Sequence, residues 1–173
     1  MTRRFDRDDG KGKIHVQSFC ALGHLDFTEI AAFSYEQLFE IMRSMHLPYP
    51  DAEQLYRRMV FNVMAKNCDD HTKNFACTMD PSGQWKLSPA FDICHSYRPG
   101  STWVSQHSLS VNGKRQNILR TDLLEVAKKM NIKKAVHILD QVKAAVANWN
   151  HFAAKTDVDA KLKEAIRQTL LLL

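Results

Sequence analysis

Hydrophobic residues first follow a clear helical period from Ser34 onward. Ser34 and Gln37 form a capping-box pattern, in which each side chain satisfies a backbone amide of the other residue. Four apolar residues behind them fall on one face of the expected helix: Leu38, Phe39, Met42 and Met45. Two prolines in segment 47–50 predict the end of this helix, because proline lacks an amide donor and biases its predecessor away from helical angles.

A second helix is predicted from Asp51 to about residue 66. Asp51 and Gln54 repeat the capping pattern. The apolar residues that follow form a wide stripe: Leu55, Tyr56, Met59, Val60, Val63 and Met64. The almost wholly polar stretch 67–74 then ends the period.

The rest of the chain after residue 74 is expected to form a hairpin, a long irregular segment and three helices. Two apolar runs, 75–79 and 84–87, flank the turn 80–83, which has proline and glycine where a type I turn prefers them. Residues 88–120 show no sustained period, so we expect a long functional or mobile segment there. Three helices close the chain: one from Thr121, one over about 133–149 and one from near Thr156.

The first 33 residues follow a different pattern. A polar, glycine-bearing turn over 8–13 separates Arg4–Arg7 from the alternating residues 14–17. We expect a short hairpin or an exposed loop here, and no core helix before Ser34. The patterns together predict one mainly α domain over 1–173, with a hinge and hairpin or loop region over 1–33 and a helical lobe over 34–173 that holds a hairpin near 75–87.

The sequence argues against a membrane-spanning protein and against a secreted protein. No apolar run approaches the ~20 residues that a membrane span requires, and no apolar signal-peptide core follows the charged start. The four cysteines are widely spaced and are expected to be free thiols, which suits a cytoplasmic protein. The net charge of +5 favours an anionic partner such as a nucleotide, a nucleic acid or an acidic protein.

The candidate chemistry lies in the polar loop 67–74 and just beyond the hairpin. Asp69 and Asn74 are spaced as Asp-x-x-x-x-Asn, and Asp92 follows the second hairpin strand. Phosphoryl transfer from Mg-ATP needs one carboxylate to orient a hydroxyl, with an asparagine and a second carboxylate to hold magnesium. Lys73 is placed to neutralise the transferring phosphoryl group. The spacing alone equally fits a loop in which Asp69 or Asp70 caps turns and Asn74 satisfies backbone groups.

The surrounding sequence resembles the HipA family of bacterial toxin kinases. The resemblance rests on five segments: Arg4-Phe5-Asp6-Arg7, 61–63, 67–74, Leu87-Ser88-Pro89-Ala90-Phe91-Asp92 and 109–115. It implies that Asp69 is the catalytic aspartate and that Asn74 and Asp92 are magnesium ligands. Lys73 and His71 match further motif positions, and His71 has either an active-site role, as a cofactor-binding residue, or a structural one. Phe5 either lies against adenine or serves in packing.

The resemblance also implies partners and an activity. It indicates a protein-kinase-like C-terminal lobe with a small hairpin that carries the catalytic loop, and a serine/threonine-protein kinase that uses ATP and Mg²⁺ in the bacterial cytoplasm. It implies a DNA-binding, HipB-like antitoxin through which DNA is contacted only indirectly, and a translation-related protein substrate.

One departure from the family pattern bears on activity. Kinases of this family carry their Gly-rich loop and ATP-binding lysine before the segment that resembles "RFDR", and here that segment begins at residue 4. We therefore expect an absent N-terminal lobe and an inactive isolated chain that supplies the base and metal ligands. The alternative is a non-catalytic helical fragment, or one half of a split kinase, that acts by binding an antitoxin or an N-terminal lobe.

Overall fold

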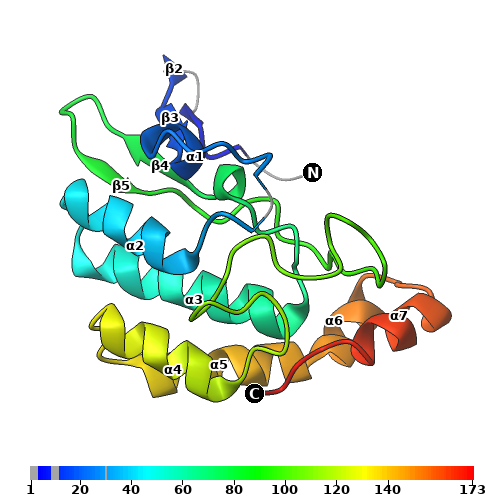
Figure 1. The fold of residues 1–173 in the computed structure, drawn as a ribbon. Coiled ribbons are helices and arrows are strands. Elements are labelled where there is room, and N and C mark those ends of the chain that lie inside the picture. The colour runs from blue at the N-terminus through cyan, green and yellow to red at the C-terminus, as the bar shows by residue number, and fades with distance from the viewer. Residues whose placement is uncertain (1–3, 9–11, 30) are drawn as a thin grey trace.

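The computed structural model describes residues 4–8, 12–29 and 31–173. Within these ranges it contains seven α-helices, a 3-10 turn and two small antiparallel sheets. The strands lie at one end of the molecule, and α3 packs between them and α5 (Figure 1). The helices are α1 (Phe19–Leu22), α2 (Tyr35–Ser44), α3 (Tyr49–Ala65), α4 (Arg120–Lys129), α5 (Ala135–Ala147), α6 (Trp149–Lys155) and α7 (Ala160–Arg167). This arrangement confirms the predicted mainly α fold with a small sheet.

Helix α2 begins at the predicted capping box. The Ser34 hydroxyl accepts from the Gln37 amide at 3.2 Å, and the Ser34 amide donates to Gln37 Oε1 at 2.8 Å. The residues of its inner face are buried: Tyr35, Leu38, Phe39 and Met42. The helix ends before the prolines, as predicted.

Helix α3 begins at Tyr49, two residues earlier than expected. Pro48 is its N-cap residue and Pro50 lies in its first turn, where a missing amide donor costs nothing. The predicted cap at Asp51 is therefore wrong, and the Asp51 carboxylate instead accepts from the Leu87 amide at 2.9 Å. The helix ends at Ala65, and its C-cap residue Lys66 has a left-handed backbone with a φ of 56°.

The predicted hairpin is present as β4 (Ala76–Met79) and β5 (Trp85–Leu87). In the turn, Asp80 Oδ1 accepts from the amides of Ser82 and Gln84 at 2.9 and 3.0 Å. A third strand, β3 (His15–Ser18), pairs with β4 on its other side. Strand β4, which follows the loop 67–74, is thus paired with a strand on each side.

The amino-terminal region reaches the core, contrary to expectation. A short hairpin is present, formed by β1 (Arg7–Asp8) and β2 (Gly12–Lys13), and the expected turn at 9–11 lies outside the described residues. After β3, however, the short helix α1 places Phe19 in the core, and the Phe19 amide donates to the Phe75 carbonyl at 2.9 Å. A partly buried strand and a core residue therefore precede Ser34.

The segment between β5 and α4 is irregular, as predicted, but it is anchored to the core. Leu109, Val111 and Ile118 are buried, and the Ser110 amide donates to the Phe33 carbonyl at 3.0 Å. The part from Leu109 to Ile118 is therefore packed, and its description as mobile is wrong.

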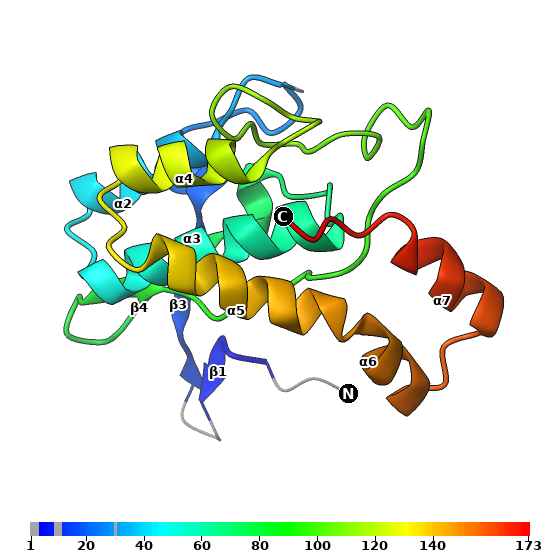
Figure 2. The ribbon, with the colours of Figure 1, turned by 90° about the horizontal axis from the view of Figure 1, so that it is seen from below.

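The carboxy-terminal helices differ from expectation in their bounds. The helix expected over 133–149 is divided at Asn148 into α5 and α6. The last helix begins at Ala160 instead of near Thr156, because Asp159 Oδ1 accepts from the amides of the first turn. The chain then returns to the end of α3, where the Leu171 amide donates to the Met64 carbonyl at 2.8 Å (Figure 2).

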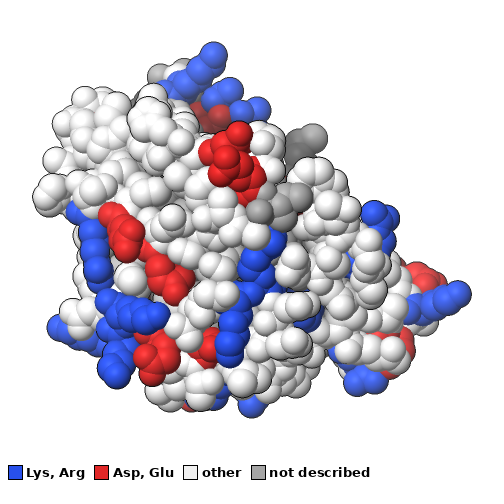
Figure 3. All heavy atoms as spheres, in the orientation of Figure 1, with Lys and Arg blue, Asp and Glu red and all other residues white. Residues whose placement is uncertain are grey.

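Surface charge is mixed on the face that Figure 3 shows. Basic and acidic side chains are interspersed there, although the chain carries a net charge of +5. Among the described residues, no helix has both the length and the apolar character needed to cross a membrane.

Candidate active site

The polar loop 67–74 is held by hydrogen bonds at both ends. At its start, the Cys68 amide donates to the Ser96 carbonyl at 3.1 Å, next to the left-handed end of α3. At its end, η1 (Thr72–Asn74) leads into β4, and Phe75 is bonded to Phe19. A loop fixed in this way to a rigid helix and sheet can hold side chains in defined positions.

Asp69 and Asn74 are brought together within this loop. Asn74 Nδ2 donates to the Asp69 carbonyl at 2.8 Å, which leaves the amide oxygen of Asn74 available as a ligand. The Asp69 carboxylate is 45% exposed, and its Oδ1 lies 3.8 Å from His71 Nε2. A carboxylate that stands open to solvent beside a histidine suits an acid–base role.

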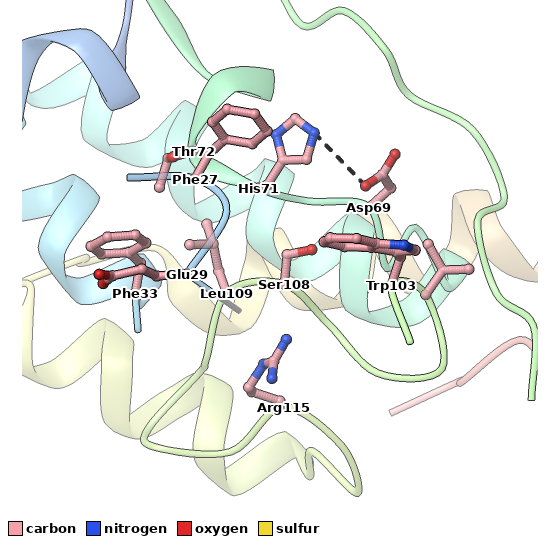
Figure 4. Close-up of a pocket in the computed structure, with 11 residues that line it drawn as sticks. Phe27, Glu29, Phe33, Asp69, His71, Thr72, Trp103, Ser108, Leu109 and Arg115 are labelled. Carbon is pink, nitrogen blue, oxygen red and sulfur yellow. Dashed lines mark ion pairs between the residues drawn. The ribbon is translucent and has the colours of Figure 1, made fainter. Parts of the chain in front are cut away.

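Asp69 and His71 line a cavity of about 260 Å³ that three distant segments form (Figure 4). The loop supplies one wall, Phe27, Glu29 and Phe33 supply a second, and residues 103–115 supply a third. Its lining includes three aromatic and three charged side chains: Phe27, Phe33, Trp103, Glu29, Asp69 and Arg115. The cavity wall thus combines carboxylate groups, a guanidinium group and apolar surface.

Lys73 lies at the edge of this arrangement. Its Nζ is 3.7 Å from the centre of the Phe27 ring, in a cation–π contact, and the side chain is exposed. The Phe27 ring also lies 6.0 Å from that of His71. Lys73 is therefore near His71 through Phe27, but it does not line the cavity.

Phe5 and Asp92 are linked through Phe91, which directly precedes Asp92 in the chain. Phe5 is 5.7 Å from Phe91, ring centre to ring centre, and Asp92 is exposed with a φ of 52°. Phe5 lines a second cavity of about 470 Å³, together with Lys13 and Lys86. Since His71 lines the first cavity, the two residues expected to bind the cofactor stand in different cavities.

The described ranges contain no cluster of three or more histidine, cysteine, aspartate or glutamate side chains that could hold a metal. The expected magnesium ligands are one asparagine and one aspartate. Magnesium commonly takes only one or two protein ligands, because water and phosphate oxygens fill its other positions.

Asp70 has a role that the sequence did not indicate. Its side chain is fully buried, and its Oδ2 accepts from the Tyr35 hydroxyl at 2.6 Å and from His107 Nδ1 at 2.9 Å. Its Oδ1 accepts from the Ser108 amide at 2.8 Å. The two adjacent carboxylates thus occupy separate environments, with Asp70 in the core and Asp69 at the cavity.

The buried bonds extend from Asp70 to the end of α3. The Tyr35 hydroxyl accepts from Asn62 Nδ2 at 3.0 Å, and Asn62 Oδ1 accepts from Asn67 Nδ2 at 3.1 Å. Asn62 and Asn67 belong to the segments that resemble the HipA family, and this chain of bonds gives them a structural role. The loop that carries Asp69 is consequently anchored from beneath.

His107 is predicted to make stability depend on pH. Burial alone lowers the pKa of His107, but the negative charge and hydrogen bond of Asp70 more than compensate and raise it to about 9. An unfolded histidine has a pKa of about 6.5. The stabilisation is therefore complete below about pH 6.5 and is lost as the pH rises through about 9.

The free energy of unfolding should accordingly fall between pH 6.5 and pH 9, by at most roughly 3 kcal/mol. Urea denaturation at a series of pH values measures this change. In the His107→Gln variant the fall should be absent, and a wild-type protein with constant stability over this range would contradict the assignment.

The chain is similar to a known protein family, to one protein by sequence and to one protein of known structure. Residues 1–149 match the family model described as "HipA-like C-terminal domain". The protein named "Putative kinase Y4mE" from Sinorhizobium fredii is 32% identical over 102 residues, which cover 54% of this chain and 24% of that protein.

The solved structure is a complex of the HipA, HipB toxin–antitoxin system of Shewanella oneidensis MR-1 with its operator DNA. One chain of it matches 84% of this chain with a TM-score of 0.63 and 19% identity. The match covers 40% of that chain. At this identity the match shows a shared fold, and this chain spans well under half the length of either protein.

Proposed function

Because the chain belongs to the HipA-like C-terminal domain family, we propose that it supplies the catalytic base and metal ligands of a serine/threonine-protein kinase. The observation that carries the proposal is the pairing of Asp69 with Asn74 in a loop anchored by the buried Asp70. This pairing holds one carboxylate at the surface and one amide oxygen free, as phosphoryl transfer requires.

Asp69 acts on the acceptor hydroxyl in this proposal. Its carboxylate accepts a hydrogen bond from the serine or threonine hydroxyl, orients the oxygen and takes the proton as the new bond to phosphorus forms. Its partial exposure supports access by a protein substrate. The buried anchor at Asp70 keeps the loop in place while the substrate binds.

Asn74 and Asp92 would hold magnesium. The Asn74 amide nitrogen is engaged by the Asp69 carbonyl, so its oxygen is free, and the exposed Asp92 carboxylate has no hydrogen-bond partner among the described residues. These groups suit a hard cation. When bound, the ion would neutralise charge on the phosphate oxygens.

We propose that ATP binds in the cavity that Phe5 lines. The cavity there has an aromatic wall and two lysines, Lys13 and Lys86, whose charges suit a nucleotide. Further parts of the nucleotide site, including a Gly-rich loop, belong to the N-terminal lobe of such kinases. A HipB-like antitoxin and a translation-related substrate are the partners that we propose from the family.

Replacing Asp92 by asparagine tests this assignment. In the protein expressed from its complete reading frame, we expect Asp92→Asn to lower transfer of labelled phosphate from Mg-ATP to protein by at least about 100-fold, because a charged ligand is lost. Part of the loss should be recovered at high Mg²⁺ concentration. Transfer is measured by radiolabel on protein serine and threonine.

Asp157→Asn is the matched control for this test. Asp157 is also exposed and also has a left-handed backbone, with a φ of 53° against 52° for Asp92. Its replacement should leave transfer unchanged. Equal transfer by both variants would contradict the metal-ligand role, whereas absence of transfer in the wild-type protein would favour a non-catalytic, partner-binding chain.

A further inference from the structure

Arg115 presents unused hydrogen-bond donors to the cavity that Asp69 lines. Its Nε donates to the His107 carbonyl at 2.6 Å, and the His107 amide donates to the Arg115 carbonyl at 3.0 Å. The two terminal nitrogens of the guanidinium have no acceptor among the residues that the structure describes. Four N–H groups therefore remain for a ligand.

The position of this guanidinium is fixed relative to the catalytic loop. Arg115 is bonded to His107 in both directions, and His107 is bonded to Asp70, which directly follows Asp69. His107 and Asp70 are both buried. A donor held this firmly binds a ligand at little further cost in conformational entropy.

The charge of Arg115 is not balanced within the cavity. Burial lowers the pKa of Arg115, although the nearby Asp70 opposes that effect, and a guanidinium keeps its charge in proteins. The carboxylates of the lining, Asp69 and Glu29, form no ion pair with it among the described residues. In Figure 4, the carboxylate of Glu29 stands apart from the Arg115 guanidinium.

Aromatic side chains complete the cavity wall. Trp103 is 61% exposed and Phe27 is 40% exposed, so both offer apolar surface at the rim. A cavity of about 260 Å³ suits the side chains of an extended segment. An unpaired guanidinium beside such surface matches a carboxylate, which it binds in a fork geometry.

We infer that this cavity binds the acceptor segment of a protein substrate and that Arg115 receives an aspartate or glutamate side chain close to the acceptor serine or threonine. That the bound segment contains the phosphate acceptor rests on the proposed kinase function. It goes further because it names the substrate class and the residue that selects it.

Peptide binding to the 173-residue chain tests the inference without ATP. The probes are fluorescein-labelled serine peptides in which one glutamate is moved along the flanks, each with a matched glutamine version. At the correct position, glutamate should bind more tightly than glutamine, and Arg115→Gln should weaken the glutamate peptide by about 10-fold or more. Fluorescence anisotropy measures both affinities.

Two variants guard against an effect of misfolding. Arg98→Gln removes an exposed arginine of the same irregular segment that does not line the cavity, and it should leave binding unchanged. Arg115→Lys keeps the charge and should keep part of the glutamate preference. The preference would be refuted if Arg115→Gln weakened both peptide versions equally, or if no position favoured glutamate.

Kinetics separate this inference from the proposed function. In an active kinase, Arg115→Gln should raise KM for the glutamate peptide and leave kcat and the KM for ATP unchanged. An equal fall in kcat for both peptides would assign Arg115 to the transferring phosphoryl group and overturn the inference. Glutamate-selective binding without any phosphoryl transfer would overturn the kinase function alone.

Discussion

Replacing Asp69 by asparagine should lower phosphoryl transfer by about 100- to 10,000-fold, since asparagine cannot accept the hydroxyl proton. The fold should be unaffected, because the Asp69 side chain is 45% exposed and the bond to Asn74 uses its backbone carbonyl. The assay measures phosphate transfer from Mg-ATP to a serine-containing acceptor by the protein expressed from its complete reading frame.

The control for this variant is Asp140→Asn. Asp140 is exposed on α5 and pairs with Arg120 at the surface, so its replacement should change neither transfer nor stability by a measurable amount. Asp69→Asn protein that binds Mg-ATP normally and still transfers phosphate at the wild-type rate would exclude Asp69 as the base.

Replacing Asp70 by alanine should have the largest effect on stability. The variant leaves a buried, protonated His107 and a buried Tyr35 hydroxyl without their acceptor, and removing one partner of a buried ion pair commonly costs about 3–5 kcal/mol. Urea denaturation gives the free energy of unfolding directly.

Asp69→Ala is the control for the stability of the Asp70→Ala variant. Asp69→Ala changes the same residue type one position earlier, in a partly exposed setting, and should alter the free energy of unfolding by less than about 0.5 kcal/mol. Both variants should lose phosphoryl transfer, but only Asp70→Ala should be destabilised. Similar stability of the two variants would show that the buried bonds of Asp70 contribute little.

Local patterns predicted the elements that local interactions stabilise. The capping box at Ser34 and the apolar stripe of α3 are readable within one or two turns, and both were correctly placed. The start of α3 differs from the prediction because Pro50 predicts a helix stop, although proline is well accommodated in a first turn. The alternating residues 14–17 predict a hairpin strand or a loop, but not the pairing of β3 with β4, because β4 lies about 60 residues further along the chain.

The candidate site divides in the same way. The sequence of the polar loop 67–74 indicates Asp69 and Asn74, and the contact between these two residues is local because they are five positions apart. Arg115 lies in the segment 109–115 that resembles the family, but no short-range pattern indicates that Arg115 and Ser108 line the cavity, because they reach it only through tertiary packing. One signal was present: residues 107 to 111 alternate between polar and apolar types after His107, and the structure buries His107, Leu109 and Val111 in that register.

The construction of the cavity from three separate segments has a consequence for protein engineering. Phe27, Glu29 and Phe33 meet segments 67–74 and 103–115 there, and Asp70 ties segment 67–74 to segment 103–115 through His107 and Ser108. Transplanting the polar loop alone into a related kinase would separate Asp70 from its partners. A working chimera would have to carry all three segments together with Tyr35, so these residues form the smallest exchangeable unit of the site.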